Sequence, residues 1–244
     1  MQEKQKNTAQ VLVDCLEAEG VNVMFGIPGE ETLDLMFAIR DSHIRFIPVR
    51  HEQGAAFMAD VYGRLTGRAG VCLSTLGPGA TNLVTGVADA YLDGAPLVAI
   101  TGQVGTDRMQ LTSHQYLDLT AMFEPITKRS KQIIRPDTVG EIVRLAFKHA
   151  EKGKPGATHI DLPQNIAKMP ADAVPLKRQQ LHEVYADPTH IAAAGKIISE
   201  AKNPVILAGA VRSHAAAAVT ELADRLHIPV VNTMMAKGII PMDD

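Results

Sequence analysis

Strand-like and helix-like segments alternate along the first 165 residues of this 244-residue chain. Short apolar runs predict strands at 21–25, 44–49, 70–75, 96–101, 128–134 and 158–162. Helical periodicity predicts helices at 8–20, 30–40, 51–66, 80–92 and 138–151. Strands that alternate with helices through short glycine-bearing loops are typical of a parallel sheet with helices on both faces. The predicted fold class is therefore α/β.

The same periodicity predicts which apolar side chains are buried. In the helix at 30–40, we expect Leu33, Met36 and Phe37 to form the buried side. Near the end of the chain, Met234 and Met235 are expected to pack in a core, since methionine fills irregular apolar gaps.

The sequence predicts two domains joined by a linker. Residues 1–165 form the first domain, and residues 166–186, a polar stretch containing Pro170 and Pro175, form the linker. Residues 187–244 begin a second β-α-β unit of Rossmann-like type, which we expect to be truncated because too few strands follow to close a full sheet.

Composition excludes several classes of protein. Hydrophobic residues make up 46% of the chain, which is enough for a sizeable core, and the net charge of −3 argues against a nucleic-acid partner. No apolar run reaches the ~20 residues that span a membrane, and the polar start of the chain lacks the apolar segment of a signal peptide. Cys15 and Cys72 lie in apolar segments and are expected as buried free thiols. These features predict a cytoplasmic protein.

Ligands of such sheets bind beyond the carboxyl ends of the strands. This rule selects four segments as the candidate site: 26–29, 50–53, 76–82 and 102–115. Two of them are rich in glycine, which lets the backbone approach a flat ligand closely.

Glu52 is the first candidate catalytic residue. It follows a predicted strand and begins a helix, and Gly54, Ala55 and Ala56 behind it leave room for a ligand. A carboxylate in such a crevice is suited to proton exchange near neutral pH. The alternative is a carboxylate that only stabilises the start of a helix through the macrodipole.

Two further segments carry candidate residues. The turn that contains Gly77, Pro78 and Gly79 precedes a helix whose start could bind an anion; the alternative is an ordinary strand-to-helix turn. It has neither the dinucleotide-binding fingerprint nor the spacing of a P-loop. His114 and Gln115 lie in a long loop at the same edge, with a solvated surface pair as the alternative. No histidines show metal-ligand spacing, so no metal ligand is predicted in this chain.

These segments together resemble the thiamine-diphosphate-dependent 2-oxoacid enzymes, and among them acetolactate synthase. The matching strings are FGIPG (25–29), VRHE (49–52), GPGATNL (77–83), ADA (88–90), PLVAITGQ (96–103), PG (155–156) and IDLP (160–163). They occur in the family's order and at matching spacings across essentially the whole chain. The resemblance identifies residues 1–165 as the pyrimidine-binding domain and residues 187–244 as part of the central domain.

The resemblance implies roles for individual residues. Glu52 bonds the aminopyrimidine ring of thiamine diphosphate and promotes formation of the ylide, which condenses two pyruvate molecules to 2-acetolactate with loss of carbon dioxide. Gln115 faces the reacting centre. The implied cofactor-binding residues are Gly26, Ile27, Pro28, Gly29, Glu52, Pro78 and Asn82.

The resemblance also implies what other parts supply. The family holds the diphosphate and Mg²⁺ on a domain bearing Gly-Asp-Gly, a motif that this chain lacks, and builds each site between two subunits. We therefore expect a homodimer or homotetramer, and no turnover by this chain alone. The stretches at 114–118 and 121–128 look like the catabolic, FAD-free branch, whereas 80–103 fits the biosynthetic branch equally. From the first two stretches we expect the catabolic type, without FAD.

Three alternatives remain at this point. The first is another thiamine-diphosphate-dependent decarboxylase or carboligase. The second is a non-catalytic assembly module that keeps the fold and the subunit interface. The third is a nucleotide-binding α/β protein, which is disfavoured because no phosphate-binding glycine motif is present.

Overall fold

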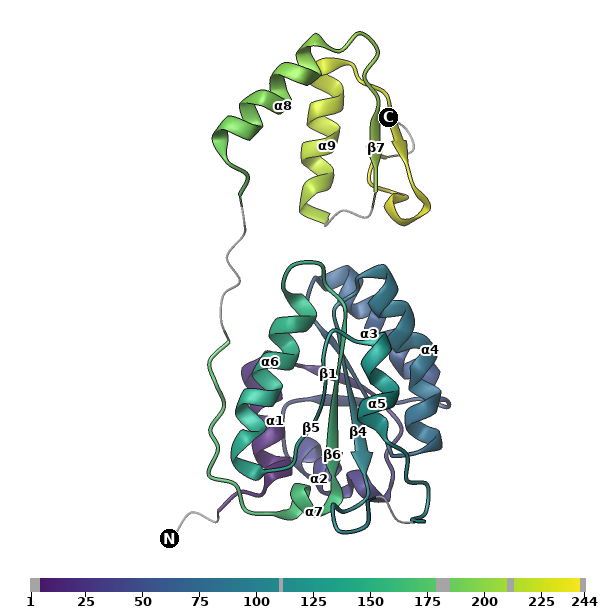
Figure 1. Cartoon of the computed structure of the whole chain (residues 1–244), viewed down its shortest axis with the longest axis vertical. Coiled ribbons are helices and arrows are strands. Elements are labelled where there is room, and N and C mark those ends of the chain that lie inside the picture. Colours follow the sequence, from purple (N-terminus) through teal and green to yellow (C-terminus); the bar gives the residue numbers. More distant parts are fainter. Residues whose placement is uncertain (1–4, 110–111, 179–184, 210–212, 242–244) are drawn as a thin grey trace. The chain divides into compact units, whose positions relative to one another are not determined.

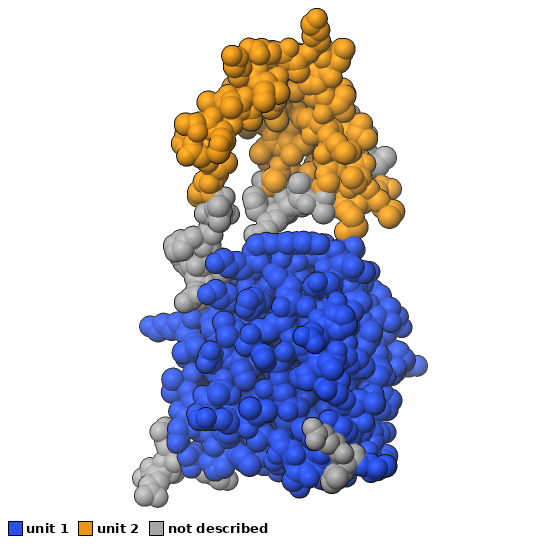
Figure 2. Space-filling view, viewed as in Figure 1, with its two compact units in different colours: residues 1–181 blue, residues 182–244 orange. Residues whose placement is uncertain are grey.

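The computed structural model describes residues 5–109, 112–178, 185–209 and 213–241. The chain forms two compact units, Met1–Leu181 and His182–Asp244 (Figure 2).

The first unit is built on a six-stranded sheet in the order β2-β1-β3-β4-β6-β5, and every pair of neighbours is parallel. The strands are β1 (Val23–Gly26), β2 (Arg45–Pro48), β3 (Gly70–Ser74), β4 (Leu97–Gln103), β5 (Ser130–Gln132) and β6 (Ala157–Pro163). The central strands β3, β4 and β6 are buried along their whole length, as expected for apolar strands covered on both faces.

Helices cover both faces of this sheet, so the predicted fold class is confirmed (Figure 1). The helices are α1 (Thr8–Ala18), α2 (Leu33–Arg40), α3 (Glu52–Thr66), α4 (Pro78–Asp93), α5 (Leu119–Phe123), α6 (Val139–Glu151) and α7 (Gln164–Lys168). Apolar side chains of α1, α2, α6 and α7 share one core with the sheet, and those of α3, α4 and α5 share the other.

Small residues let α3 and α4 approach the sheet and each other closely. A Cβ atom at Gly63 of α3 would lie 2.2 Å from the Pro96 carbonyl oxygen, and one at Gly86 of α4 would lie 2.6 Å from the Ala56 Cβ atom. The second core is correspondingly rich in alanine. This close packing holds α3 against α4 and the last turn of α3 against the residue that precedes β4.

Both cysteines are free and buried, as predicted. Burial raises the pKa of the Cys15 thiol and of the Cys72 thiol to about 12, because an apolar surrounding disfavours the thiolate.

The predicted buried side of α2 is wrong for two of its three residues. Met36 is partly buried against the first core, but Leu33 and Phe37 are 47% and 55% exposed. The buried side chains of this helix are Leu35, Ala38 and Ile39. The α-helix begins only at Leu33, after a 3₁₀ turn at Glu30–Thr32, and it is apolar around most of its circumference. The spacing of apolar residues therefore could not show which face of α2 is buried.

The stretch predicted as a linker from residue 166 contains packed structure. Gln164–Lys168 forms helix α7, in which Ile166 and Ala167 are buried. Further along, the backbone of residues 5–8 meets that of 169–172: Thr8 N–H donates to Met169 O at 2.9 Å, and Ala171 N–H donates to Lys6 O at 3.0 Å. The compact unit accordingly extends beyond residue 165, to Leu181.

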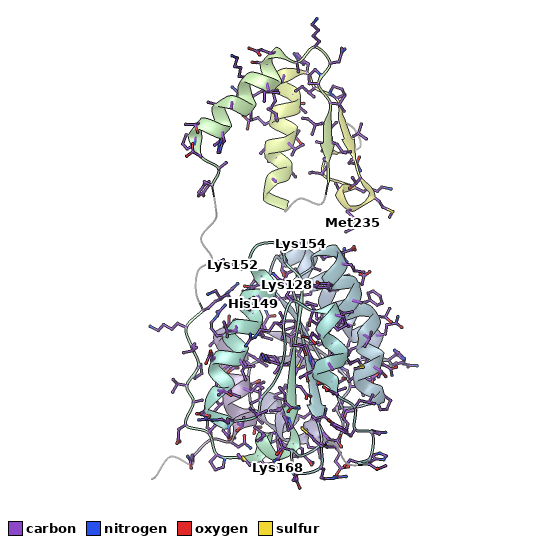
Figure 3. The ribbon with its side chains drawn as sticks, in the orientation of Figure 1. Lys128, His149, Lys152, Lys154, Lys168 and Met235 are labelled. Atoms are coloured by element: carbon purple, nitrogen blue, oxygen red, sulfur yellow. The ribbon has the colours of Figure 1, made fainter. Side chains whose placement is uncertain are left out.

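The second unit contains α8 (Pro188–Glu200), β7 (Ile206–Ala208), α9 (Ser213–Leu226) and β8 (Val230–Asn232). The two strands are parallel, and a small buried cluster consists of Ala208, Ala236 and Ile239. Met234 is 89% exposed and Met235, labelled in Figure 3, is 46% exposed, so the predicted core packing of these methionines is wrong. Both lie in the 3₁₀ turn Met234–Ala236, which buries Ala236 instead.

Labelled side chains mark the two edges of the sheet in the first unit (Figure 3). Lys154 precedes the start of β6, while Lys168 closes α7 just after the end of β6. The strands are parallel, so the end near Lys168 is the carboxyl edge, where ligands of this fold class bind. Within the described ranges, no helix has both the length and the hydropathy to cross a bilayer.

Candidate functional site

The loops that follow β1, β2 and β3 are joined at the carboxyl edge. Ile27 N–H donates to Leu73 O at 3.2 Å, and Val49 N–H donates to Gly26 O at 3.1 Å. A Cβ atom at Gly26 would lie 2.3 Å from Leu73 O, so this approach of β1 to β3 requires glycine. The predicted loop residues Gly26 and Ile27 are thus fixed beside the end of β3.

The rest of this loop packs on Thr75. A Cβ atom at Gly29 would lie 2.4 Å from the Thr75 Cβ atom, and the Thr75 hydroxyl donates to Glu31 Oε2 at 2.8 Å. Pro28, between the two glycines, is exposed. The sequence analysis missed Thr75 and Glu31, although both lie at strand-to-helix turns of the edge that it had selected.

Glu52 lies in the first turn of α3 and is 8% exposed. The preceding residue, His51, caps the helix: its Nδ1 accepts a hydrogen bond from Gln53 N–H at 3.2 Å. A carboxylate in this turn is also stabilised by the helix macrodipole. Capping explains why the helix begins here, and therefore why the carboxylate lies at the edge of the sheet.

The start of α4 supplies the partner of Glu52. Asn82 Nδ2 donates to Glu52 Oε2 at 2.9 Å, so the structure brings together two candidates that are 30 positions apart in the sequence. A Cβ atom at Gly79 would lie 3.3 Å from Glu52 Oε1. Pro78 occupies the first position of α4 and is exposed. The carboxylate is thus oriented by a neutral amide on one oxygen and bordered by a glycine at the other.

Gln115 reaches this site from the loop after β4. It is exposed and has φ +57°, which is unusual for a residue other than glycine. Its backbone lies against Gly77, where a Cβ atom would lie 2.4 Å from Gln115 O. The structure therefore places Gln115 beside the turn that begins α4. The neighbouring His114 is exposed.

A buried polar chain that the sequence analysis missed lies beneath this loop. His159 is fully buried and stacks on Phe123 at a ring-centroid distance of 4.1 Å; burial lowers its pKa to about 3. The Thr101 hydroxyl lies 2.9 Å from His159 Nε2 and 2.9 Å from Asp161 Oδ1. Burial raises the pKa of the Asp161 carboxyl to about 7, although hydrogen bonds from Gln132 and Thr101 lower it.

Among the residues that the structure describes, no group of three or more His, Cys, Asp or Glu side chains is arranged to hold a metal ion.

Two family models match the chain. Residues 6–122 match the thiamine pyrophosphate enzyme N-terminal TPP binding domain, and residues 191–244 match the thiamine pyrophosphate enzyme central domain. The first match contains Glu52, Asn82 and Gln115, and it ends within α5.

Curated proteins similar to the chain carry acetolactate synthase names. A probable acetolactate synthase large subunit of Methanocaldococcus jannaschii is 43% identical over 96% of this chain and 41% of its own length. A catabolic acetolactate synthase of Raoultella terrigena is 43% identical over 84% of this chain and 37% of its own length. An acetolactate synthase of Mycobacterium bovis is 39% identical over 98% of this chain and 40% of its own length.

The chain thus spans only about two fifths of the length of these relatives, from 37% to 41%. Both domain models that match the chain are models of thiamine pyrophosphate enzymes. The chain belongs to the family of thiamine pyrophosphate enzymes.

Proposed function

We propose that the first unit supplies the pyrimidine-binding half of an acetolactate synthase site, in which two pyruvate molecules condense to 2-acetolactate. The observation that carries the proposal is the buried Glu52 carboxylate at the carboxyl edge, which is oriented by Asn82. The acetolactate synthase names of the relatives support the reaction class.

The residues at this edge fit a flat aromatic ring. Gly79 leaves the side of Glu52 Oε1 without a side chain, and a Cβ atom at Gly54 would meet nothing within 4 Å. Asn82 holds the other carboxylate oxygen, so Oε1 is the atom that we assign to hydrogen-bond a ring nitrogen and to exchange a proton with it. The loop from Gly26 to Gly29 and Pro78 would border the ring.

When bound, thiamine diphosphate supplies the carbon nucleophile and the electron sink for decarboxylating a 2-oxoacid; the protein contributes position and electrostatics. By resemblance, Mg²⁺ and the diphosphate belong to the Gly-Asp-Gly domain, which completes the site. Gln115, beside Gly77, is assigned to the side of the site where the substrate reacts.

The test is acetolactate formation by the longest reading frame that contains this chain, with thiamine diphosphate, Mg²⁺ and pyruvate. Glu52→Gln should lower the rate by at least about 100-fold, the contribution of a positioned acid–base group. Glu141→Gln makes the same change in the first turn of α6, at an exposed site, and should leave the rate unchanged.

Other outcomes of this assay identify the alternatives. Release of aldehyde without acetolactate would favour a decarboxylase. An absence of turnover with any 2-oxoacid, in a protein that still folds, would favour a non-catalytic assembly module. An unchanged rate in Glu52→Gln would contradict the assignment of this carboxylate.

We also propose that a second subunit covers the outer face of α3. Four apolar side chains of this helix are exposed: Phe57 (36%), Met58 (41%), Val61 (50%) and Leu65 (79%). Such a stripe is typical of a protein–protein interface. Val61→Glu should therefore shift the oligomer towards monomer in light-scattering measurements, whereas Ile134→Glu, at an isolated exposed position (62%), should not.

The catabolic, FAD-free assignment extends this proposal. It rests on the sequence at 114–118 and 121–128, while a catabolic relative and a relative not so named are equally similar, at 43% identity. Flavin absorbance near 450 nm in the purified enzyme would contradict it.

A further inference from the structure

Asp161 is a buried carboxylate at the centre of a cluster of donors. It lies on β6 and is 0% exposed. The Thr101 hydroxyl donates to its Oδ1 at 2.9 Å, and Gln132 Nε2 donates to its Oδ2 at 2.6 Å. Donors from both neighbouring strands, β4 and β5, therefore converge on this carboxylate.

The amide of Gln103, on the neighbouring strand β4, holds the loop that follows this strand. Gln103 is 1% exposed, its Nε2 donates to Leu117 O at 3.0 Å, and its Oε1 accepts from Val104 N–H at 3.0 Å. The Leu117 carbonyl is an acceptor only, while Val104 N–H is a donor only. These partners fix which way the amide points.

The loop is held at two places around Gln115. On one side, Gln115 packs against Gly77, whose φ of +51° and close contact require glycine. On the other, the carbonyl of Leu117, two residues further along, is bound by Gln103. The Gln115 backbone, with φ +57°, lies between these two contacts. Such a conformation persists only where the surroundings enforce it.

We propose that Gln103 is a positioning residue that holds the Gln115 loop (112–118) at the site. The value of this placement for the reaction depends on the proposed function; the contact itself does not. Gln103 belongs to the buried strand β4, so a buried side chain fixes the position of the exposed loop.

The first test uses hydrogen exchange on this chain. Gln103→Leu removes the amide but keeps a buried side chain, and exchange of the amides in 112–118 should accelerate about fivefold, the effect of one lost hydrogen bond. The matched control is Gln132→Leu, which removes an amide that bonds the buried Asp161 but not the loop, and which should leave exchange in 112–118 unchanged. Equal acceleration in both variants, or in neither, would overturn the proposal.

A second measurement needs no variant, in case Gln103→Leu fails to fold. In the wild-type chain, NMR should detect scalar coupling across the hydrogen bond between Gln103 Nε2 and the Leu117 carbonyl. Its absence, with the coupling from Val104 N–H resolved, would also overturn the proposal.

In the full-length enzyme, Gln103→Leu should lower kcat at least tenfold through misplacement of Gln115, whereas Gln132→Leu should not. A positioning role predicts that kcat differs between the two variants even when both lose a similar amount of stability. Equal kcat values in the two variants would show that Gln103 contributes to the fold alone. If the exchange results agree with the proposal while the enzyme forms no acetolactate, the proposed function fails and the positioning of the loop stands.

Discussion

Helix α3 carries two buried carboxylates whose surroundings differ. Asp60 is 2% exposed, and Arg64 donates to both of its oxygens at 2.7 and 3.0 Å; the same guanidinium also contacts Asp89 and Asp93. Glu52 is 8% exposed and receives one hydrogen bond, from the neutral amide of Asn82. Among the described residues, no cation pairs with Glu52.

The comparison separates a structural carboxylate from one available to a ligand. A buried charge costs free energy unless it is paired. The fold provides that pairing for Asp60 and withholds it from Glu52, so the hydrogen-bonding capacity of Glu52 remains available to a ligand at the edge of the sheet.

The largest expected effect concerns Arg64. Arg64→Met should lower the free energy of unfolding by about 3 kcal/mol, because it leaves Asp60 buried without its partner. Urea unfolding followed by circular dichroism measures this loss. Arg40→Met, which breaks an exposed pair with Asp41, should change stability by less than about 1 kcal/mol. Similar losses of unfolding free energy in both variants would contradict the structural role assigned to Asp60 and Arg64.

A smaller effect distinguishes the packing at the two ends of α3. Gly63→Ala should cost about 2 kcal/mol, because its Cβ atom would lie 2.2 Å from Pro96 O and the helix would have to move. Gly54→Ala, near Glu52, meets nothing within 4 Å and should stabilise the helix by about 0.5 kcal/mol. Thermal unfolding of the two variants measures the difference; a costly Gly54→Ala would show that the Glu52 end is also closely packed.

The smallest effect on stability is expected at Glu52 itself. Glu52→Gln keeps an oxygen that can accept from Asn82, so the free energy of unfolding should change by less than about 1 kcal/mol. Urea unfolding alongside Arg64→Met provides the comparison. A loss as large as that of Arg64→Met would mean that Glu52, too, is committed to the fold.

Much of the sheet could be predicted from the sequence because its strands are short apolar runs bounded by glycine and proline. The parallel arrangement and the carboxyl edge followed from this alternation, and with them the neighbourhood of Gly26, Glu52 and Gly77. The sequence could not reveal that Asn82 bonds Glu52, because that contact depends on how closely α3 and α4 pack.

Other features had no signal in the pattern. The buried face of α2 could not be chosen, since apolar residues occur around most of this helix. In the sequence, Asp161 and His159 look like ordinary polar residues of a strand. Their burial depends on α5, and this five-residue helix is too short to show helical periodicity. Short elements and buried polar groups were therefore missed for the same reason: their structure is determined by tertiary contacts.

The antiparallel contact between residues 5–8 and 169–172 brings the beginning and the end of the first sheet unit to one place. Gln5 Nε2 reinforces it by donating to Asp172 Oδ1 at 2.7 Å. A polypeptide that enters and leaves a module at adjacent points does not have to thread through it. Such a module can be joined to new neighbouring domains, or circularly permuted, without a change in its core. It can therefore be reused in evolution as an independent domain of larger enzymes.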